Sequence, residues 1–214
     1  MRYKTYLFDF DGTLVDSMPS YISAMLKILD ECNVKYGEDI IKTITPLGYA
    51  GTARYYKEAF GIQLSEEEII ARMKENIYEQ YLNHIPAKKN VIGTLRKLKQ
   101  SGADLNVLTA SPHAVLDVCL ERLGIYDLFS NVWSSDDFGI TKANAKIYEM
   151  AAERIDKPIS EILFIDDNLN AVKTAVSSGI AVCGIYDESS AEYTDEIRAS
   201  ADHYINTLDE IFDL

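Results

Sequence analysis

After Pro86, short apolar segments alternate with helical patterns, and this alternation constrains the fold more than any other feature of the chain. The expected strands are residues 103–108, 132–134, 162–165 and 180–185, and the expected helices are residues 90–100, 112–123, 143–154 and 171–178. Strands that alternate with helices form parallel sheets whose two faces are covered by helices. The sequence therefore predicts an α/β fold with a Rossmann-like parallel sheet.

A long helical stretch interrupts this alternation after its first strand. Residues 5–10 are short, apolar and β-prone, and they end abruptly at a turn. Residues 16–88 contain no convincing strand, and they are too many for an ordinary loop. We therefore expect an α/β core made of residues 1–15 and 89–214, with an inserted all-helical cap domain at residues 16–88.

Three helices are expected in this insertion. The first begins near Ser17, the second covers residues 52–60, and the third covers residues 65–82. Ser65 stands three residues before Glu68, which is the spacing of a capping box at a helix N-terminus. The segment is thus predicted to fold as helices packed on one another.

The chain carries an excess of acidic side chains. Its 214 residues include 21 Lys and Arg against 34 Asp and Glu, a net charge of −13. This balance argues against binding to nucleic acid or to anionic membranes, and no apolar run reaches the roughly 18 residues that span a bilayer. Cys32, Cys119 and Cys183 are widely separated and follow no metal-ligand spacing, so we expect a cytoplasmic protein. An anionic substrate would need a local cation to overcome the negative field.

Polar side chains gather where the predicted strands end. The first, second and fourth strands end in such residues, and one lysine begins the helix after the third strand; the set comprises Asp9, Asp11, Thr109, Lys142, Asp166 and Asp167. Ligands of open parallel sheets bind at the carboxyl ends of the strands, so we expect these six side chains to converge. Several carboxylates without sulfur or imidazole suit a hard divalent cation, most plausibly Mg²⁺.

These segments resemble the four motifs of the haloacid dehalogenase (HAD) superfamily of phosphohydrolases. Residues 9–17 read DFDGTLVDS, residues 108–111 read LTAS, Lys142 occupies the third motif, and residues 164–168 read FIDDN. The helical insertion between the first two motifs is similar to that of the β-phosphoglucomutase and phosphoglycolate phosphatase branch. The resemblance implies a HAD-like core with a helical cap.

The resemblance also implies a role for each residue in the chemistry. Asp9 would attack phosphorus and form an aspartyl-phosphate. Asp11 would protonate the leaving alkoxide and then deprotonate the water that hydrolyses the intermediate. Thr109 and Lys142 would hold the phosphoryl oxygens as negative charge develops on them.

A metal site follows from the same resemblance. Mg²⁺ would be held by Asp9, by the main-chain carbonyl of Asp11 and by Asp167. Asp166 would act on the metal through water. A further aspartate often follows in the fourth motif of the family, and this chain has Asn170 at that position.

The third motif departs from the family pattern as well. The family usually has proline directly after the lysine and again two residues later, where this chain has Ala143 and Ala145. Lys142 remains in place, although Lys146 is a competing candidate for its role.

Two features of the cap have alternative interpretations. Arg54 is a candidate for binding a substrate carboxylate or a second phosphate through paired hydrogen bonds, and the alternative is a solvated helix arginine. Asp16 and Ser17 are interpreted either as the N-cap of the first cap helix or as part of the hinge that the resemblance implies.

The leading functional hypothesis is a Mg²⁺-dependent phosphatase, either monomeric or weakly dimeric. Its substrate would be a small phosphorylated metabolite such as phosphoglycolate, a sugar phosphate or a nucleoside monophosphate. A β-phosphoglucomutase-type mutase is the nearest alternative. A dehalogenase is disfavoured because Asp11 is present, and a non-catalytic binding protein is disfavoured because Asp9 and Asp11 are both intact.

Overall fold

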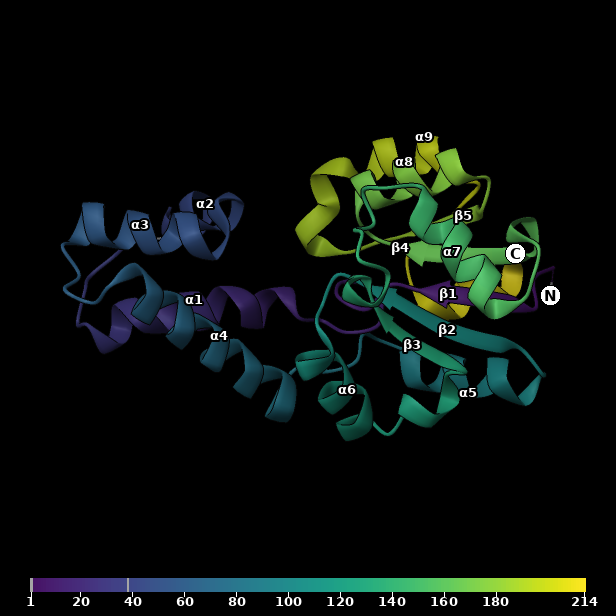
Figure 1. Ribbon diagram of the computed structural model, residues 1–214, viewed down its shortest axis with the longest axis horizontal. Helices are drawn as coiled ribbons and strands as arrows, with labels where there is room; N and C mark the ends of the chain where they lie inside the picture. Colours follow the sequence, from purple (N-terminus) through teal and green to yellow (C-terminus); the bar gives the residue numbers. More distant parts are fainter. Residues whose placement is uncertain (1, 38) are drawn as a thin grey trace. The chain divides into compact units, whose positions relative to one another are not determined.

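The computed structural model describes residues 2–37 and 39–214 (Figure 1). The chain divides into two compact units, which we call the core unit (Met1–Asp16 and Pro86–Leu214) and the helical unit (Ser17–Ile85). The sequence predicts these boundaries after residues 15 and 88, and in the structure they fall after Asp16 and Ile85. None of the helices in the described part of the chain is long and apolar enough to cross a membrane.

A sheet of six parallel strands forms the centre of the core unit. The strands are β1 (Thr5–Phe8), β2 (Asp104–Thr109), β3 (Asn131–Ser134), β4 (Ile162–Asp166), β5 (Ala181–Ile185) and β6 (His203–Ile205). Their order across the sheet is β3-β2-β1-β4-β5-β6, and every pairing is parallel. The predicted α/β fold with a Rossmann-like parallel sheet is confirmed.

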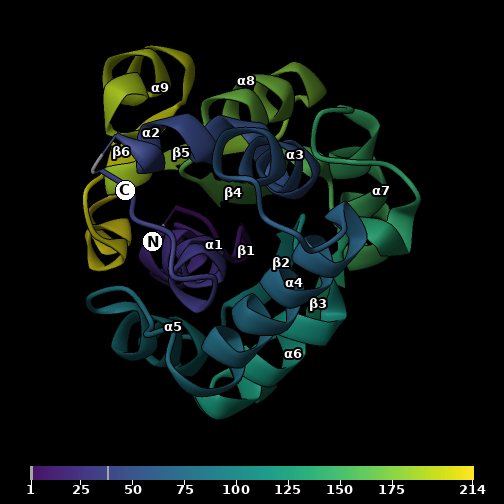
Figure 2. The same ribbon diagram turned by 90° about the vertical axis from the view of Figure 1, so that its left-hand side faces the viewer.

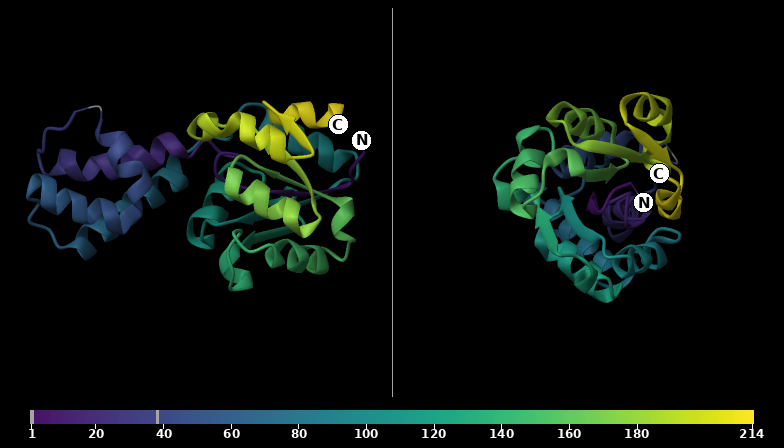
Figure 3. Two further views of the ribbon diagram at one scale, coloured as in Figure 1. Left: turned by 90° about the horizontal axis from the view of Figure 1, so that it is seen from above. Right: turned by 90° about the vertical axis from the view of Figure 1, so that its right-hand side faces the viewer.

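Helices cover both faces of this sheet (Figure 3). One face carries α5 (Val91–Gln100) and α6 (His113–Arg122), and the other carries α7 (Lys146–Ile155), α8 (Leu169–Ser178) and α9 (Thr194–Ser200). Short 3₁₀ segments complete the chain: η1 (Thr45–Leu47), η2 (Tyr126–Leu128), η3 (Ser135–Phe138), η4 (Ile159–Glu161), η5 (Glu188–Tyr193) and η6 (Leu208–Asp213). Strands β1, β2, β4 and β5 are almost wholly buried, as expected of a parallel sheet covered on both faces, whereas the edge strands β3 and β6 are largely half-buried.

The register of the central strands brings their carboxyl ends level with one another. Phe8, the last residue of β1, pairs with Val107 of β2 and with Ile165 of β4. The chain order reverses at β1, so the β1/β4 boundary is the switch point at which sheets of this kind bind ligands.

The helical unit consists of α1 (Met18–Glu31), α2 (Ile40–Ile44), α3 (Gly48–Phe60) and α4 (Glu66–Asn83). Helices α1 and α3 each pack against α4 (Figure 2), and the buried side chains between them include Ile28, Tyr56 and Met73. The predicted capping box is confirmed, because Ser65 accepts a hydrogen bond from the Glu68 N–H and the Glu68 side chain accepts one from the Ser65 N–H.

The structure of this unit differs from the sequence expectations in three respects. Helix α3 begins at Gly48, four residues before the predicted start, and α2 was not predicted. Ser17 occupies the N-cap position of α1, but its side chain makes no capping hydrogen bond, and its buried hydroxyl has no partner in the described part of the chain. Ser17 is therefore the N-cap residue by position, but the capping hydrogen bond expected of its side chain is absent.

The two chain segments that join the units run side by side on the core side of the boundary. Val15 and Ala87 form an antiparallel bridge. The Asp16 N–H donates to the Pro86 carbonyl at 3.0 Å, and the Lys88 N–H donates to the Leu14 carbonyl, also at 3.0 Å. The two segments that connect the core unit to the helical unit thus form one short antiparallel pair of chain segments.

Candidate active site

The loop after β1 carries Asp9 at its start. The Asp9 N–H donates to the Ile165 carbonyl at 2.9 Å, which continues the β1–β4 pairing one residue beyond the strand. The next residues form a tight turn, in which the Leu14 N–H donates to the Phe10 carbonyl. Gly12 has a φ of +75°, and a Cβ added there would lie 2.6 Å from the carboxylate oxygens of Asp167. A side chain at residue 12 would therefore be strained by the backbone and would clash with the acidic end of β4.

Two aspartates stand at the end of β4. Asp166 accepts the Asn168 N–H at 2.7 Å through Oδ1, and Asn168 in turn caps α8 with its side chain. Asp167 accepts a hydrogen bond at 3.1 Å from the hydroxyl of Thr13. The loop after β1 and the loop after β4 are therefore joined directly by side chains.

Lys142 reaches both of these loops. Its ammonium donates to Asp9 and, at 2.7 Å, to Asp166 Oδ2. Lys142 lies in a turn rather than at the start of a helix, because α7 begins only at Lys146. Lys146 itself is exposed, and no ion pair is described for it. Of the two candidate lysines, Lys142 is the one that contacts the carboxylates.

Three of the carboxylates form a compact buried cluster. Asp9, Asp166 and Asp167 each offer an oxygen, and these oxygens lie within 4.8 Å of one another. Asp11 is not part of this cluster.

The cluster is electrostatically unfavourable by itself. The pKa of Asp9 is raised to about 7, because the effects of burial and of the neighbouring Asp166 and Asp11 outweigh the opposing effect of Lys142. Burial likewise raises the pKa of Asp167, and the neighbouring Asp166 and Asp9 add to that rise. The pKa of Lys142 is raised by Asp166 and Asp9, although its burial acts in the opposite direction. One lysine faces three carboxylates, and their oxygen-only donor set fits a hard divalent cation.

Asp11 and Thr109 are held by a serine to which the sequence analysis gave no role. The Ser111 hydroxyl donates to Asp11 Oδ2 at 2.5 Å, and the Ser111 N–H donates to the Thr109 hydroxyl oxygen at 3.0 Å. Thr109 thus bonds its own loop through its oxygen and keeps its hydroxyl proton for another acceptor. The signal for Ser111 was its position two residues after Thr109, at the same strand end.

The seven predicted site residues do not lie in one unit. Six belong to the core unit, at or just beyond the strand ends or in the turn before α7. Arg54 lies exposed on α3 of the helical unit. A second residue absent from the sequence analysis, Lys88, contacts the Gly12 carbonyl next to the cluster.

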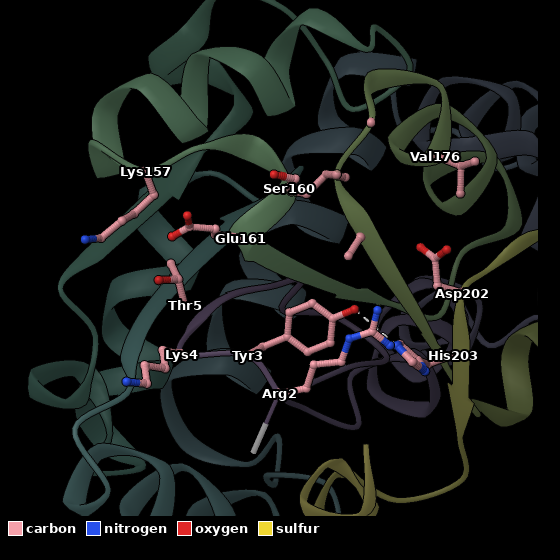
Figure 4. A pocket seen from close by; sticks show the side chains of 13 residues that line it. Arg2, Tyr3, Lys4, Thr5, Lys157, Ser160, Glu161, Val176, Asp202 and His203 are labelled. Atoms are coloured by element: carbon pink, nitrogen blue, oxygen red, sulfur yellow. Dashed lines mark hydrogen bonds between the residues drawn. The ribbon is translucent and has the colours of Figure 1, made fainter.

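A cavity of about 780 Å³ lies at the other edge of the sheet, where the strands begin (Figure 4). Its lining includes Thr5, Ala181 and His203, which are the first residues of β1, β5 and β6. None of the predicted site residues lines it. The volume of this cavity therefore says nothing about the carboxylate cluster.

Comparisons with known proteins agree with this arrangement. The family model of the haloacid dehalogenase-like hydrolases matches residues 3–179. A phosphoglycolate phosphatase of Haemophilus influenzae is 30% identical over 193 aligned positions, and the match covers 86% of each chain. The pyrophosphatase PpaX of Bacillus velezensis is 26% identical over 187 aligned positions, and the match covers 86% of this chain and 83% of that protein.

Solved structures share the fold over nearly the whole chain. A predicted phosphoglycolate phosphatase from Haemophilus somnus has a TM-score of 0.81 at 23% identity, with 100% of this chain and 98% of that chain covered. A Thermotoga maritima protein that is provisionally named β-phosphoglucomutase has a TM-score of 0.85 at 22% identity, with 98% and 97% covered. At these identities the likeness concerns the fold alone.

Proposed function

This chain belongs to the haloacid dehalogenase-like hydrolase family and is a phosphatase of that family, and from this we propose a specific reaction. The enzyme is Mg²⁺-dependent and hydrolyses small phosphorylated metabolites through an aspartyl-phosphate. The observation that carries the proposal is the buried cluster of Asp9, Asp166 and Asp167 in contact with Lys142 at the carboxyl edge of the sheet.

The proposed reaction has two steps. A carboxylate oxygen of Asp9 attacks phosphorus, the bond from phosphorus to the alkoxide breaks, and Asp11 gives its proton to the departing oxygen. In the second step Asp11 takes a proton from a water molecule, which attacks the same phosphorus. The phosphorus–Asp9 bond then breaks, so Asp9 is regenerated and inorganic phosphate leaves. The hydrogen bond from Ser111 supports the role of Asp11 because it fixes the carboxyl that moves the proton.

The remaining site residues are assigned to binding. Asp9, Asp167 and the main-chain carbonyl of Asp11 would hold Mg²⁺, with Asp166 acting on it through water. The bound cation would supply positive charge that offsets the carboxylates and the phosphate. Lys142 and the hydroxyl of Thr109 hold the phosphoryl oxygens as their charge increases.

The names of two relatives support particular compounds as substrates to test. The phosphoglycolate phosphatase of H. influenzae supports a small carboxylated phosphate ester, and PpaX adds pyrophosphate to the compounds to test. Sugar phosphates and nucleoside monophosphates remain in the proposed range. Arg54 is proposed to bind a substrate carboxylate or second phosphate, which its exposure on α3 permits. We further propose a cytoplasmic monomer or weak homodimer, and the free state of the three cysteines supports that compartment.

The experiment is a panel of these phosphate compounds with Mg²⁺, in which released inorganic phosphate is measured. We expect turnover of at least one compound and its complete loss with EDTA. Asp9→Asn should reduce kcat by about 10³-fold or more, because an amide cannot form the acyl phosphate. Asp104→Asn makes the same chemical change at the other edge of the sheet and should leave kcat unchanged.

Two outcomes would contradict the proposal. Full activity in Asp9→Asn would show that Asp9 is not the nucleophile, and no phosphate release by folded wild-type protein across the panel would exclude the phosphatase. A mutase would instead interconvert sugar phosphate isomers when a bisphosphorylated sugar is added.

A further inference from the structure

Lys88 is a partly buried lysine whose ammonium donates three hydrogen bonds. It donates to the Gly12 carbonyl at 2.5 Å, to the Tyr186 carbonyl at 2.7 Å and to Asp187 Oδ2 at 2.8 Å. An ammonium has three donors, so each of them has an acceptor. The side chain of Lys88 is 18% exposed and that of Asp187 is 6% exposed. This contact is therefore shielded from solvent, unlike an ordinary surface ion pair.

The three acceptors belong to two loops that flank the candidate active site. Gly12 lies in the loop after β1, and Tyr186 and Asp187 follow β5. Lys88 itself lies in the segment that returns from the helical unit and pairs with residues 14–16. One side chain thus fixes three segments of the core unit to one another.

Gly12 connects the hydrogen bonds of Lys88 with the carboxylate cluster. It directly follows Asp11, whose main-chain carbonyl is a proposed Mg²⁺ ligand, and it precedes Thr13, which donates to Asp167. Its Cα is packed so closely on Asp167 that a Cβ would lie 2.6 Å from the carboxylate oxygens. A shift of the Gly12 backbone would therefore change its packing against Asp167, a proposed Mg²⁺ ligand at the end of β4.

Lys88 also stabilises the charge of its own partner. Burial alone would raise the pKa of Asp187, but the hydrogen bonds from Lys88 and Ser189 outweigh burial and lower it. The negative charge on Asp187 in turn contributes to the raised pKa of Asp167. The lysine therefore compensates a buried anion close to the cluster while it holds the loop.

We propose that Lys88 is a positioning residue of the active site, which holds the Gly12 carbonyl and so fixes the backbone of the loop after β1 in the geometry that binds Mg²⁺. This inference rests on the proposed function. It assigns no contact between Lys88 and the substrate or the metal.

The test compares Lys88→Met with Lys89→Met. Methionine keeps the length of the side chain and removes its donors, and Lys89 is the exposed neighbour that serves as the matched control. Mg²⁺ binding is measured by calorimetry without substrate. We expect Lys88→Met to weaken Mg²⁺ binding about tenfold or more, which is typical when a residue that orients a metal ligand is lost. At saturating Mg²⁺, kcat should also fall while the KM for substrate stays near that of the wild type, and Lys89→Met should match the wild type in each respect.

A second variant separates positioning from simple destabilisation. Lys88→Met leaves Asp187 buried without its cation, which by itself destabilises the fold. The double variant Lys88→Met/Asp187→Asn removes that charge, keeps an acceptor for the Ser189 N–H, and still leaves the Gly12 carbonyl without its donor. We expect it to recover thermal stability and to retain the weakened Mg²⁺ binding. Lys88→Arg restores charge and donors and should bind Mg²⁺ better than Lys88→Met.

The inference is overturned if the folded double variant binds Mg²⁺ as tightly as the wild type, because Lys88 would then be structural only. Such a result would leave the phosphatase proposal intact. Failure of the wild type itself to bind Mg²⁺ or to release phosphate would instead contradict the proposed function.

Discussion

At the scale of single residues, Gly12 is a position of the site where even one added methyl group does not fit. Gly12→Ala introduces a Cβ at φ +75° and 2.6 Å from the Asp167 oxygens. Gly102 is a matched control, because its φ is +84° but nothing lies within 4 Å of its Cβ position. We expect both alanine variants to lose roughly 1–2 kcal/mol of unfolding free energy through the backbone. Only Gly12→Ala should also lose activity, by about 100-fold, since a small displacement of reacting groups has that effect.

Thermal denaturation and phosphate release measure the two effects separately. If Gly12→Ala and Gly102→Ala kept the same kcat, close packing of the loop on Asp167 would not matter for catalysis.

Ser111 is a second position at which one atom can be tested. Ser111→Ala removes the hydroxyl that donates to Asp11 at 2.5 Å. We expect kcat to fall by up to about tenfold, because the hydrogen bond that orients the Asp11 carboxyl group contributes roughly 0.5–1.5 kcal/mol. Ser177→Ala removes an exposed hydroxyl on α8 and should leave steady-state kinetics unchanged. An unaltered kcat in Ser111→Ala would mean that Asp11 does not need this partner.

At the scale of elements, the start of α4 depends on its capping box. Ser65→Ala removes the side-chain acceptor for the Glu68 N–H and should cost about 1 kcal/mol of stability. Glu68→Gln retains an acceptor for the Ser65 N–H and should cost much less. Chemical denaturation followed by circular dichroism compares the two. Equal losses would imply that the charge of Glu68 contributes as much to this helix end as the hydrogen bond to the Ser65 hydroxyl.

The contact between α6 and η3 should depend on pH. His113 bonds Asp117 on its own helix and Asp137 on η3, both at 2.9 Å, and these hydrogen bonds raise its pKa. Because the pKa of His113 is higher in the folded protein than in the unfolded chain, where it is about 6.5, protonation of His113 stabilises the fold. This stabilisation is fully present below about pH 6.5 and is lost as the pH rises through the pKa of the folded protein. His113→Gln should therefore have a lower Tm than the wild type near pH 6, and the difference should shrink as pH rises above the pKa of His113. A difference that grows with pH would contradict this charge pairing.

Elements with a strong hydrophobic period were predictable from the sequence, and weakly patterned ones were not. Gly48 and Gly51 disfavour a helix by propensity, so the pattern suggested that α3 begins at Thr52, but packing in the helical unit extends the helix through both glycines. Strand β6 has only three residues, too few to show a period.

The site shows the same division. Asp9, Thr109 and Asp166 were predictable because they directly end or follow buried strands. Lys88 was not, because its acceptors lie 76, 98 and 99 residues away in sequence, and only the folded sheet brings them to its ammonium.

At the scale of the whole molecule, stability without metal should fall as pH rises. The raised pKa of Asp9, about 7, means that the folded protein holds this proton more tightly than the unfolded chain does. Folding is therefore progressively disfavoured from about pH 4 through 7 unless a cation replaces the proton. We expect Mg²⁺ to raise the Tm more at pH 8 than at pH 5.5, as measured by thermal denaturation with and without the ion.

Asp9→Asn is the control for this pH effect, because it removes one titrating member of the cluster. Its response to Mg²⁺ should be smaller and should vary less with pH. A Mg²⁺-induced shift in the wild type that is the same at both pH values would mean that the cluster does not titrate with metal binding.

The antiparallel bridge between Val15 and Ala87 has a consequence for how such a chain can be diversified. The chain segments on either side of the helical unit pair with each other within the core unit. The helical unit is therefore an insertion whose two ends are already held together by the core unit. The entropy of closing a loop grows only slowly with its length, so an insertion of a different size would change core stability little. The bridge thus makes the segment between Val15 and Ala87 an insertion site. A foreign domain, or a short hairpin turn, could replace the helices there while the catalytic loops keep their conformation.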